Sequence, residues 1–437
     1  MTDIKIVVIL IGWSCYMKKY LSIFLTIILV ISLLGSNVSY ATEIWEEKET
    51  ATEKTTEKSS EDETQNTTNS MPAIETTGKS VVLMEGSTGK VIYEKNKDEQ
   101  LIPASITKIM TLLLIFEALD NKKISLTDQV SVSEHAASMG GSQVFLEPNE
   151  TQTVDTMIKC ISIASANDAA TAMAELISGS ETEFVVAMNQ RAEELGMKNT
   201  HFMNCSGLDD DINSGHYSSA YDVALMSREL ITKHPDISKY STVWMDTFVH
   251  TTKKGEKEFG LTNTNKLIRT YNGITGLKTG STSKAKYCLS ATAKRNGMDL
   301  IAVVMACPSP KDRFAEAAKL LDYGFAHCRL YEDNHETLKL DPIIIAKGVA
   351  DSIIAKPTDK FSYVFFEGVK DEDIKKEVII KEDITAPIKE GDQVGEIRYI
   401  LNDKTIGNVP IISTQSVEKA KYKDYLGKIV NKYFMND

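Results

Sequence analysis

The sequence predicts an α/β fold, a sandwich in which helices cover one antiparallel sheet, followed by a small all-β domain. Two short apolar runs near residue 85 and a meander between residues 273 and 306 have strand character, and helical stretches lie between and after them. After Leu338 the pattern changes to short alternating runs separated by Gly, Asp, Asn and Pro. Such runs are typical of a β-rich domain.

The N-terminus predicts export. Met17-Lys18-Lys19 is a basic start, Leu21–Leu34 is an apolar core, and Ser39-Tyr40-Ala41 is a small-x-small cleavage site. We therefore expect a signal peptide over residues 1–41, and an uncleaved anchor helix is the alternative. Residues 42–77 are rich in Thr, Glu, Ser and Lys with few large apolar residues, which predicts a flexible linker.

Charge and cysteine content exclude some classes of function. The chain of 437 residues carries a net charge of −12, whereas a nucleic-acid partner normally requires a basic patch. Of the six cysteines, Cys15 lies in the predicted signal peptide, and the other five are widely spaced. That spacing predicts buried thiols instead of a disulfide framework. No group of His, Cys and Asp has metal-site spacing, so we predict no metal and no cofactor.

The first ordered domain is expected over residues 78–330. Ser80–Met84 and Lys90–Tyr93 have the pattern of two strands joined by a hairpin turn at Gly86–Gly89. An apolar run from Ile109 to Leu119 follows, and its lack of a polar face predicts a buried helix.

Ser105 and Lys108 stand at the start of that helix, in Pro103-Ala-Ser-Ile-Thr-Lys108. Residues i and i+3 share a helix face, so the hydroxyl and the amine should point the same way. Burial favours the neutral amine, which could take the proton of a serine nucleophile. The spacing alone is not specific, because Ser-x-x-Lys also occurs at Ser87, Ser281, Ser283 and Ser416.

The middle of the chain, from about Val154 to Leu230, predicts helices. Asp155–Ile163 and Ala169–Ile177 have helical spacing, and the polar break Ser165-Ala166-Asn167 separates them. Two interpretations of the break have equal weight. Ser165 and Asn167 could face a cleft, or one of them could cap the next helix.

Residues 273–280 predict an edge strand that carries Lys278-Thr279-Gly280. Tyr287–Lys294 and Leu300–Ala306 predict two further strands of the meander, and Arg313–Phe325 predicts the closing helix.

The C-terminal part predicts a β-rich domain over residues 331–415 and an amphipathic helix over residues 416–437. Tyr422, Leu426, Ile429 and Tyr433 fall on one face of this helix, with lysines elsewhere. That composition suits a helix lying on a membrane surface, which we prefer to the alternative of a helix packed on the β domain.

Three motifs occur in order at wide spacings: Ser105-x-x-Lys108, Ser165-x-Asn167 and Lys278-Thr279-Gly280. From about Lys79 to Phe325 the chain resembles the D-alanyl-D-alanine carboxypeptidases, the low-molecular-mass penicillin-binding proteins of peptidase family S11. Phe202–Leu208 and Gly215–Asp222 look like that family's neighbouring signatures. The resemblance implies a serine β-lactamase/DD-peptidase-like sandwich with a helical subdomain.

By this resemblance, the activity is removal of the terminal D-alanine from peptidoglycan stem pentapeptides on the extracytoplasmic side of the bacterial membrane, with β-lactams as inhibitors. Ser105 would attack the carbonyl between the two D-alanines and form an acyl-enzyme. Lys108 would be the general base, Ser165 would bridge Lys108 to the leaving amine, and Asn167 would hold the amide carbonyl of the substrate.

The same resemblance assigns the substrate-binding residues. Lys278 and Thr279 would bind the terminal carboxylate, and Arg313 stands where the family often has a carboxylate-binding arginine. Gly280 would keep the strand edge bare for the peptide. The backbone N–H groups of Ser105 and Ser281 would form the oxyanion hole.

The chain departs from the family's usual pattern at two positions, and two alternative functions share part of its features. Ala166 replaces a Gly or Asp, and Ser281 replaces a histidine found in some members. A β-lactamase shares the fold but requires a water-activating Glu-x-x-Leu-Asn loop, which Glu193–Asn199 does not match. A non-catalytic peptidoglycan-binding protein is disfavoured because every expected side chain is present.

Overall fold

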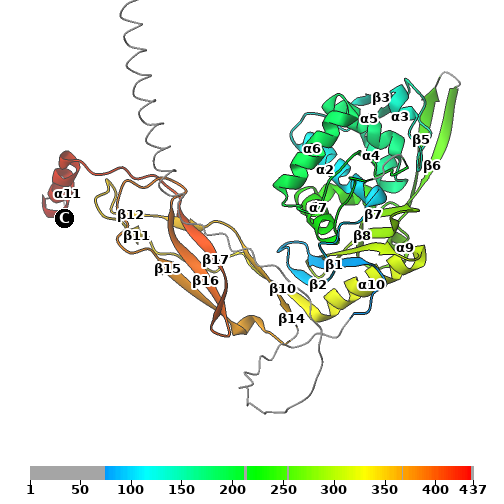
Figure 1. Cartoon of the computed structure of the whole chain (residues 1–437). Coiled ribbons are helices and arrows are strands. Elements are labelled where there is room, and N and C mark those ends of the chain that lie inside the picture. The colour runs from blue at the N-terminus through cyan, green and yellow to red at the C-terminus, as the bar shows by residue number, and fades with distance from the viewer. Residues whose placement is uncertain (1–73, 211–213, 253–254, 367, 435–437) are drawn as a thin grey trace, which may run out of the picture. The chain divides into compact units, whose positions relative to one another are not determined.

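The computed structural model describes residues 74–210, 214–252, 255–366 and 368–434 (Figure 1). The predicted signal peptide and nearly all of the predicted linker lie outside the described residues. The last residues of that linker are an exception, because Ile74 is buried and the backbone N–H of Thr77 donates to Glu316. The ordered domain therefore includes several residues before residue 78, where the sequence predicts its start.

A five-stranded antiparallel sheet, in the order β2-β1-β9-β8-β7, forms the centre of the first domain. The predicted hairpin and meander supply all of its strands. Their bounds are β1 Ser80–Glu85, β2 Val91–Lys95, β7 Ile274–Thr282, β8 Lys286–Arg295 and β9 Met298–Cys307. The strand with the Lys-Thr-Gly motif, β7, is an edge strand as predicted.

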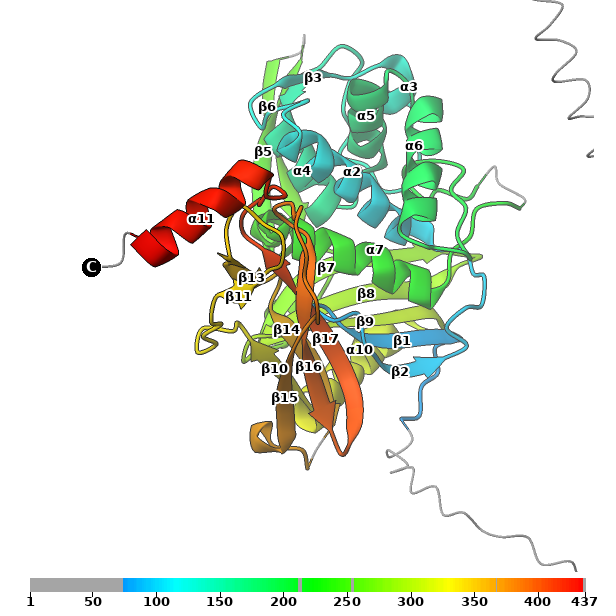
Figure 2. The ribbon, with the colours of Figure 1, turned by 90° about the vertical axis from the view of Figure 1, so that its left-hand side faces the viewer.

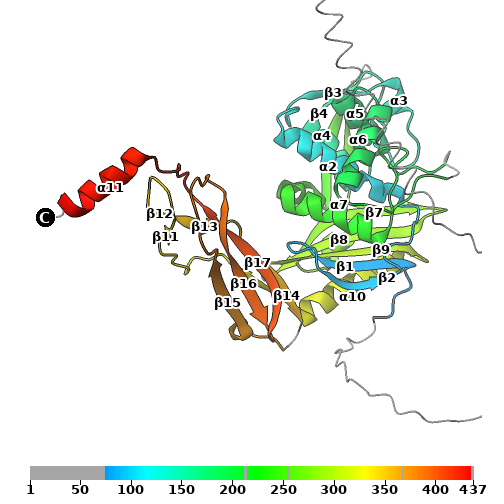
Figure 3. The same cartoon turned by 60° about the vertical axis from the view of Figure 1, so that its left-hand side comes forward.

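Helices cover both faces of the sheet, as Figures 2 and 3 show for α7 (Ala220–Lys233) on one side and α10 (Pro310–His327) on the other. Alternate residues of a strand point to opposite faces. Val82 and Met84 accordingly belong to the core that also contains α7 residues, whereas Val81 belongs to the core that contains Leu320 of α10. This burial on both faces explains why β1 is buried throughout and why its central residues Val81–Met84 are all apolar and lack an alternating pattern.

The helical part contains the predicted buried helix, but that helix starts later than expected. A 3₁₀ turn, η1 (Ala104–Thr107), contains Ser105, and α2 (Lys108–Asp120) follows it. Ser105 therefore lies one turn before the α-helix and not inside it. The other helices of this part are α3 Glu134–Ala137, α4 Val154–Ile163, α5 Asn167–Ser178, α6 Glu181–Glu194 and α8 Ser238–Ser241.

Two small two-stranded antiparallel sheets border the helices: β3 (Gln129–Ser131) with β4 (Thr151–Thr153), and the hairpin of β5 (Met245–Thr252) and β6 (Gly255–Thr262). The short elements η2 (Pro235–Ile237) and α9 (Leu267–Thr270) complete this part.

The C-terminal region is all-β up to its last helix, as predicted. Its largest sheet has the order β13-β17-β16-β15. The elements are β10 Cys328–Asp333, β11 Ile343–Ile344, β12 Ser352–Ile353, β13 Ala355–Pro357, β14 Phe361–Phe366, η3 Asp371–Asp373, β15 Ile374–Ile380, β16 Gln393–Leu401, β17 Lys404–Ser413 and α11 Tyr422–Phe434. Within the described ranges, no helix is both long enough and apolar enough to cross a bilayer.

Candidate active site

Lys108 is the centre of the candidate site. Its side chain is fully buried at the start of α2, and its Nζ lies 3.1 Å from Ser105 Oγ, 2.5 Å from Asn167 Oδ1 and 2.7 Å from the carbonyl oxygen of Ser206. Burial lowers the pKa of Lys108 to about 7, against smaller opposing effects from neighbouring acidic groups. A lysine in this state is half neutral near neutral pH, so it can accept a proton from Ser105.

Lys278, at the edge of the sheet, contacts the second motif. Its Nζ donates to Ser165 Oγ at 2.8 Å and to the carbonyl of Thr279 at 3.1 Å. Burial is the main cause that places the pKa of Lys278 well below its ordinary value, and the charges of Lys108 and Arg313 add to it. The three predicted motifs therefore converge in one place, through Lys108 on one side and Lys278 on the other.

The contacts of Ser165 differ from the expected ones. We predicted that Ser165 would bridge to Lys108, but in the structure it accepts from Lys278, and Asn167 contacts Lys108. The capping interpretation is wrong, because Ala166 is the N-cap of α5 and makes no side-chain cap. Ser165 has a left-handed backbone with φ of 63°, which turns the chain between α4 and α5 so that both polar side chains face the lysines.

Gly280 has a structural role that the sequence did not predict. A Cβ at this position would lie 2.6 Å from the carbonyl oxygen of Pro103 and 3.1 Å from the backbone N of Ile106. Its lack of a side chain therefore lets β7 approach the turn that carries Ser105. Ser281, the next residue, is exposed on the same edge strand.

Arg313 contacts the backbone of the edge strand β7 and of its neighbour β8. Its Nη1 donates to the carbonyl oxygens of Gly280 at 3.0 Å and of Cys288 at 3.4 Å, and its guanidinium lies over the rings of Tyr287 and Phe314. Burial lowers the pKa of Arg313. Among the ion pairs of the described ranges, neither Arg313 nor Lys278 has a carboxylate partner. Buried cations are normally paired, so this edge is suited to receive an anion.

Comparisons with known proteins agree with the motifs. Residues 65–309 match the family model for D-alanyl-D-alanine carboxypeptidase, and residues 325–419 match the model for the C-terminal domain of penicillin-binding protein 5. The chain belongs to the D-alanyl-D-alanine carboxypeptidase family, peptidase family S11. It is therefore an enzyme of the serine carboxypeptidase type, and the predicted family, fold class and activity are confirmed.

Individual relatives cover most of this carboxypeptidase. D-alanyl-D-alanine carboxypeptidase DacF of Bacillus subtilis is 46% identical over 351 residues, which is 80% of this chain and 88% of the relative. DacC of Escherichia coli is 34% identical over 81% of this chain and 87% of its own length. The crystal structure of penicillin-binding protein 5 from Haemophilus influenzae is 30% identical, covers 80% of this chain and 100% of its own, and has a TM-score of 0.70.

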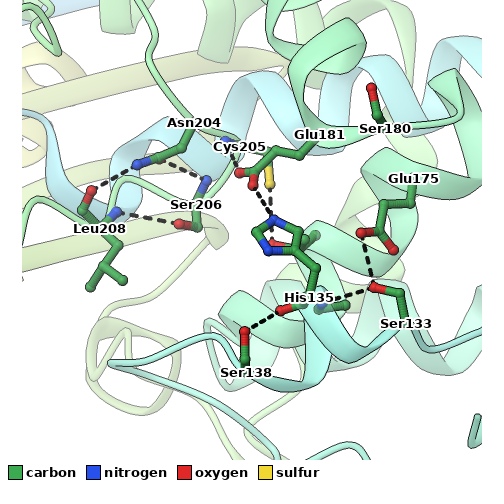
Figure 4. Close-up of polar contacts among 12 residues, drawn as sticks. Ser133, His135, Ser138, Glu175, Ser180, Glu181, Asn204, Cys205, Ser206 and Leu208 are labelled. Carbon is green, nitrogen blue, oxygen red and sulfur yellow. Dashed lines mark hydrogen bonds and ion pairs between the residues drawn. The ribbon is translucent and has the colours of Figure 1, made fainter. Parts of the chain in front are cut away.

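Sequence reasoning missed the loop Asn204–Leu208 as a functional element of the carboxypeptidase, although it noted the stretch (Figure 4). This loop supplies the Ser206 carbonyl to Lys108. Asn204 fixes it by accepting from the backbone N–H groups of Ser206 and Gly207 and donating to the carbonyl of Leu208. At Gly207, where φ is +80°, a Cβ would lie 1.9 Å from the carbonyl oxygen of Ala104, beside Ser105. The Asn-x-x-Gly spacing of Asn204 and Gly207 is the sequence feature that could have indicated this tight turn.

His216 contacts η1, the turn that carries Ser105, and was also missed. Its Nδ1 accepts from the backbone N–H of Met203 at 3.0 Å, so the neutral ring carries its proton on Nε2 and donates to Thr107 Oγ1 at 2.8 Å. Burial lowers the pKa of His216 to about 4, so the ring is neutral at neutral pH. Thr264 is a further contributor, since its hydroxyl lies 2.7 Å from that of Thr279.

All five cysteines of the described ranges are buried. In those ranges, no group of three or more His, Cys, Asp or Glu side chains has a metal-binding arrangement.

Proposed function

We propose that Ser105 is the nucleophile of this D-alanyl-D-alanine carboxypeptidase and that Lys108 is its general base. The observation that supports this most directly is the 3.1 Å contact between Lys108 Nζ and Ser105 Oγ, made by an amine whose burial lowers its pKa to about 7. The neutral amine takes the hydroxyl proton as Oγ attacks the carbonyl carbon of the penultimate D-alanine. The C–N bond to the terminal D-alanine then breaks and leaves an ester on Ser105.

Ser165 returns the proton to the leaving nitrogen in this proposal. Its oxygen accepts from Lys278, which leaves its own O–H free to donate into the cleft. The proton that Lys108 received must then replace the one given by Ser165. This transfer requires Lys108 and Ser165 to approach one another when substrate is bound. Catalytic hydrogen bonds often tighten only in the complex with substrate. Asn167, held by Lys108 and by the carbonyl of Gly140, has one amide N–H left for the substrate.

The terminal carboxylate of the substrate binds at Lys278 and Thr279, with Arg313 adding positive charge behind the strand. Two buried cations without an acidic partner in the described ranges favour an anionic ligand, and a bound carboxylate would raise the pKa of Lys278 toward its ordinary value. Gly280 brings the strand against the catalytic turn, and the N–H groups of Ser105 and Ser281 stabilise the tetrahedral oxyanion. A β-lactam would acylate Ser105 through the same contacts.

We further propose that the chain is exported and acts at the outer surface of the cytoplasmic membrane, which it contacts through α11. This proposal includes a signal peptide of residues 1–41, a linker that starts at residue 42 and ends before Ile74, a catalytic domain that ends at residue 330, a β domain at 331–415 and the terminal segment 416–437. Six exposed apolar or aromatic side chains of α11 follow helical spacing and support the membrane contact: Tyr422, Tyr425, Leu426, Ile429, Val430 and Tyr433.

A pentapeptide ending in D-Ala-D-Ala tests the reaction. The purified protein should release D-alanine, and product analysis should separate hydrolysis from cross-linking to an added amine. Mass spectrometry after penicillin treatment tests the nucleophile, because Ser105→Ala should carry no adduct. An adduct that survives this change would exclude Ser105.

A further inference from the structure

A cavity of about 590 Å³ lies outside the three motifs, between the loop that contains Phe145 and the β5–β6 hairpin. Its size is typical of sites for small ligands. Its lining mixes two aromatic rings, Phe145 and Phe259, with the polar side chains of Glu147, His250 and Lys257. Neither the motifs nor the roles proposed above use this cavity.

Phe145 is held in a costly conformation. Its φ is 63°, which is rare for a bulky side chain, and 63% of its surface is exposed. The backbone N–H groups on both sides of it, from Val144 and Leu146, donate to the buried carboxylate of Asp168, each at 3.1 Å. An aromatic ring that is fixed by its neighbours, strained and yet exposed indicates a functional position.

The same loop leads directly to the candidate active site. The backbone N–H of Asn167 donates to the carbonyl of Ser142 at 2.7 Å, and its side chain donates to the carbonyl of Gly140. The three residues from Ser142 to Phe145 span at most about 10 Å. The four stem-peptide residues on the acyl side of the scissile bond span about 14 Å when extended, so a peptide that runs from Ser105 past Asn167 along this loop carries its attached sugar toward the cavity.

The hairpin presents one face to the cavity. His250 pairs with Lys257 and Phe248 pairs with Phe259, so these side chains share a face of the two strands. The Nδ1 of His250 lies 2.9 Å from the buried carboxylate of Glu150, whereas no described residue hydrogen-bonds its Nε2. His250 is only 7% exposed, and it lines the cavity. The ring of Phe145 meets that of Phe259 edge to face, with centroids 6.1 Å apart.

We propose that this cavity binds a sugar ring of the glycan strand to which the stem peptide is attached. The inference rests on the proposed carboxypeptidase function. Aromatic rings pack against the apolar C–H face of a sugar, and His250 and Lys257 supply hydrogen bonds to its hydroxyl and acetamido groups. Binding a part of the substrate remote from the reacting bond can assist positioning of that bond.

Three substrates test the proposal with the full-length protein: diacetyl-L-lysyl-D-alanyl-D-alanine, a free pentapeptide ending in D-Ala-D-Ala, and the same pentapeptide linked to N-acetylmuramic acid. For Phe145→Ala, kcat/KM for the sugar-linked substrate should fall about tenfold relative to the other two, since one aromatic contact is lost. Lys257→Ala, which lies away from the loop that contacts Asn167, should give a loss with the same selectivity. Glu258→Ala, on the opposite face of β6, is the matched control and should leave the ratio unchanged.

The outcomes separate the two levels of inference. If Phe145→Ala and Lys257→Ala lower kcat/KM equally for the free and the sugar-linked pentapeptide, the occupant is peptide and the sugar assignment is overturned. If neither variant changes the ratio among the substrates by more than twofold, the cavity has no role in substrate binding. Failure of the proposed function would appear differently, as a wild-type protein that cleaves none of the three substrates.

Discussion

Acylation of Ser105 should follow the titration of Lys108. Only the neutral amine can accept the hydroxyl proton, and burial lowers the pKa of Lys108 from an ordinary value of 10.5 to about 7. The rate constant for acylation by benzylpenicillin should therefore rise with pH and level off above neutrality. The rate of acylation should be measured between pH 5 and pH 9 by stopped-flow or quenched reactions, at saturating and at subsaturating concentrations of the β-lactam.

The size of the effect follows from the pKa. With a midpoint near 7, the neutral fraction of Lys108 is about 1% at pH 5 and about 90% at pH 8. The second-order acylation constant should differ by about 90-fold between these values, with a slope of about tenfold per pH unit below pH 6. A lysine with an ordinary pKa would instead still be gaining tenfold per unit at pH 9.

Asn167→Asp provides a matched variant for this prediction. It places a carboxylate where Oδ1 now lies, 2.5 Å from Lys108 Nζ, and changes little else in size. A negative charge so close should raise the pKa of Lys108 and move the acylation midpoint up by about one to three units. An acylation constant that is flat between pH 5 and pH 8, or an unchanged midpoint in Asn167→Asp, would refute the role of Lys108 as base.

Three further predictions concern the surroundings of the site and the membrane. Gly207→Ala should lower the acylation constant by about 100-fold, because its new Cβ would displace the turn that carries Ser105. Gly196→Ala is the control and should leave the acylation constant unchanged, since φ at Gly196 is also positive but a Cβ there meets no atom within 4 Å. The folded pKa of His216 lies below the unfolded value of 6.5, so its contribution to the free energy of unfolding is fully present above pH 6.5. This contribution should fall by about 3 kcal/mol as the pH is lowered toward 4. Urea titrations at several pH values should show the loss for the wild type and not for His216→Gln. Ile429→Glu should weaken flotation with anionic vesicles more than Asn431→Glu, which makes the same charge change on the other side of α11; equal effects would argue against insertion of the apolar face.

Periodicity and composition were sufficient for most elements of the fold. The hairpin at residues 80–95, the meander, the helices of the middle region and the C-terminal strands were predicted because each has its own local pattern of apolar residues. The start of α2 was misplaced, since the apolar run does not distinguish a 3₁₀ turn from the first turn of an α-helix. The extent of the linker was misjudged because Ile74 is ordered by contacts with distant residues.

The sequence by itself determined the family, because three motifs in a characteristic order carry the hydroxyls and amines that amide cleavage requires, and it predicted which groups take part in the chemistry. Only the tertiary structure decided which group contacts which. Ser165 accepts from Lys278 instead of Lys108, and Gly280 serves the approach of a strand to the catalytic turn. The physical reason is that these contacts join residues more than 100 positions apart, and their geometry is set by packing of the sheet against the helices, which no local pattern encodes.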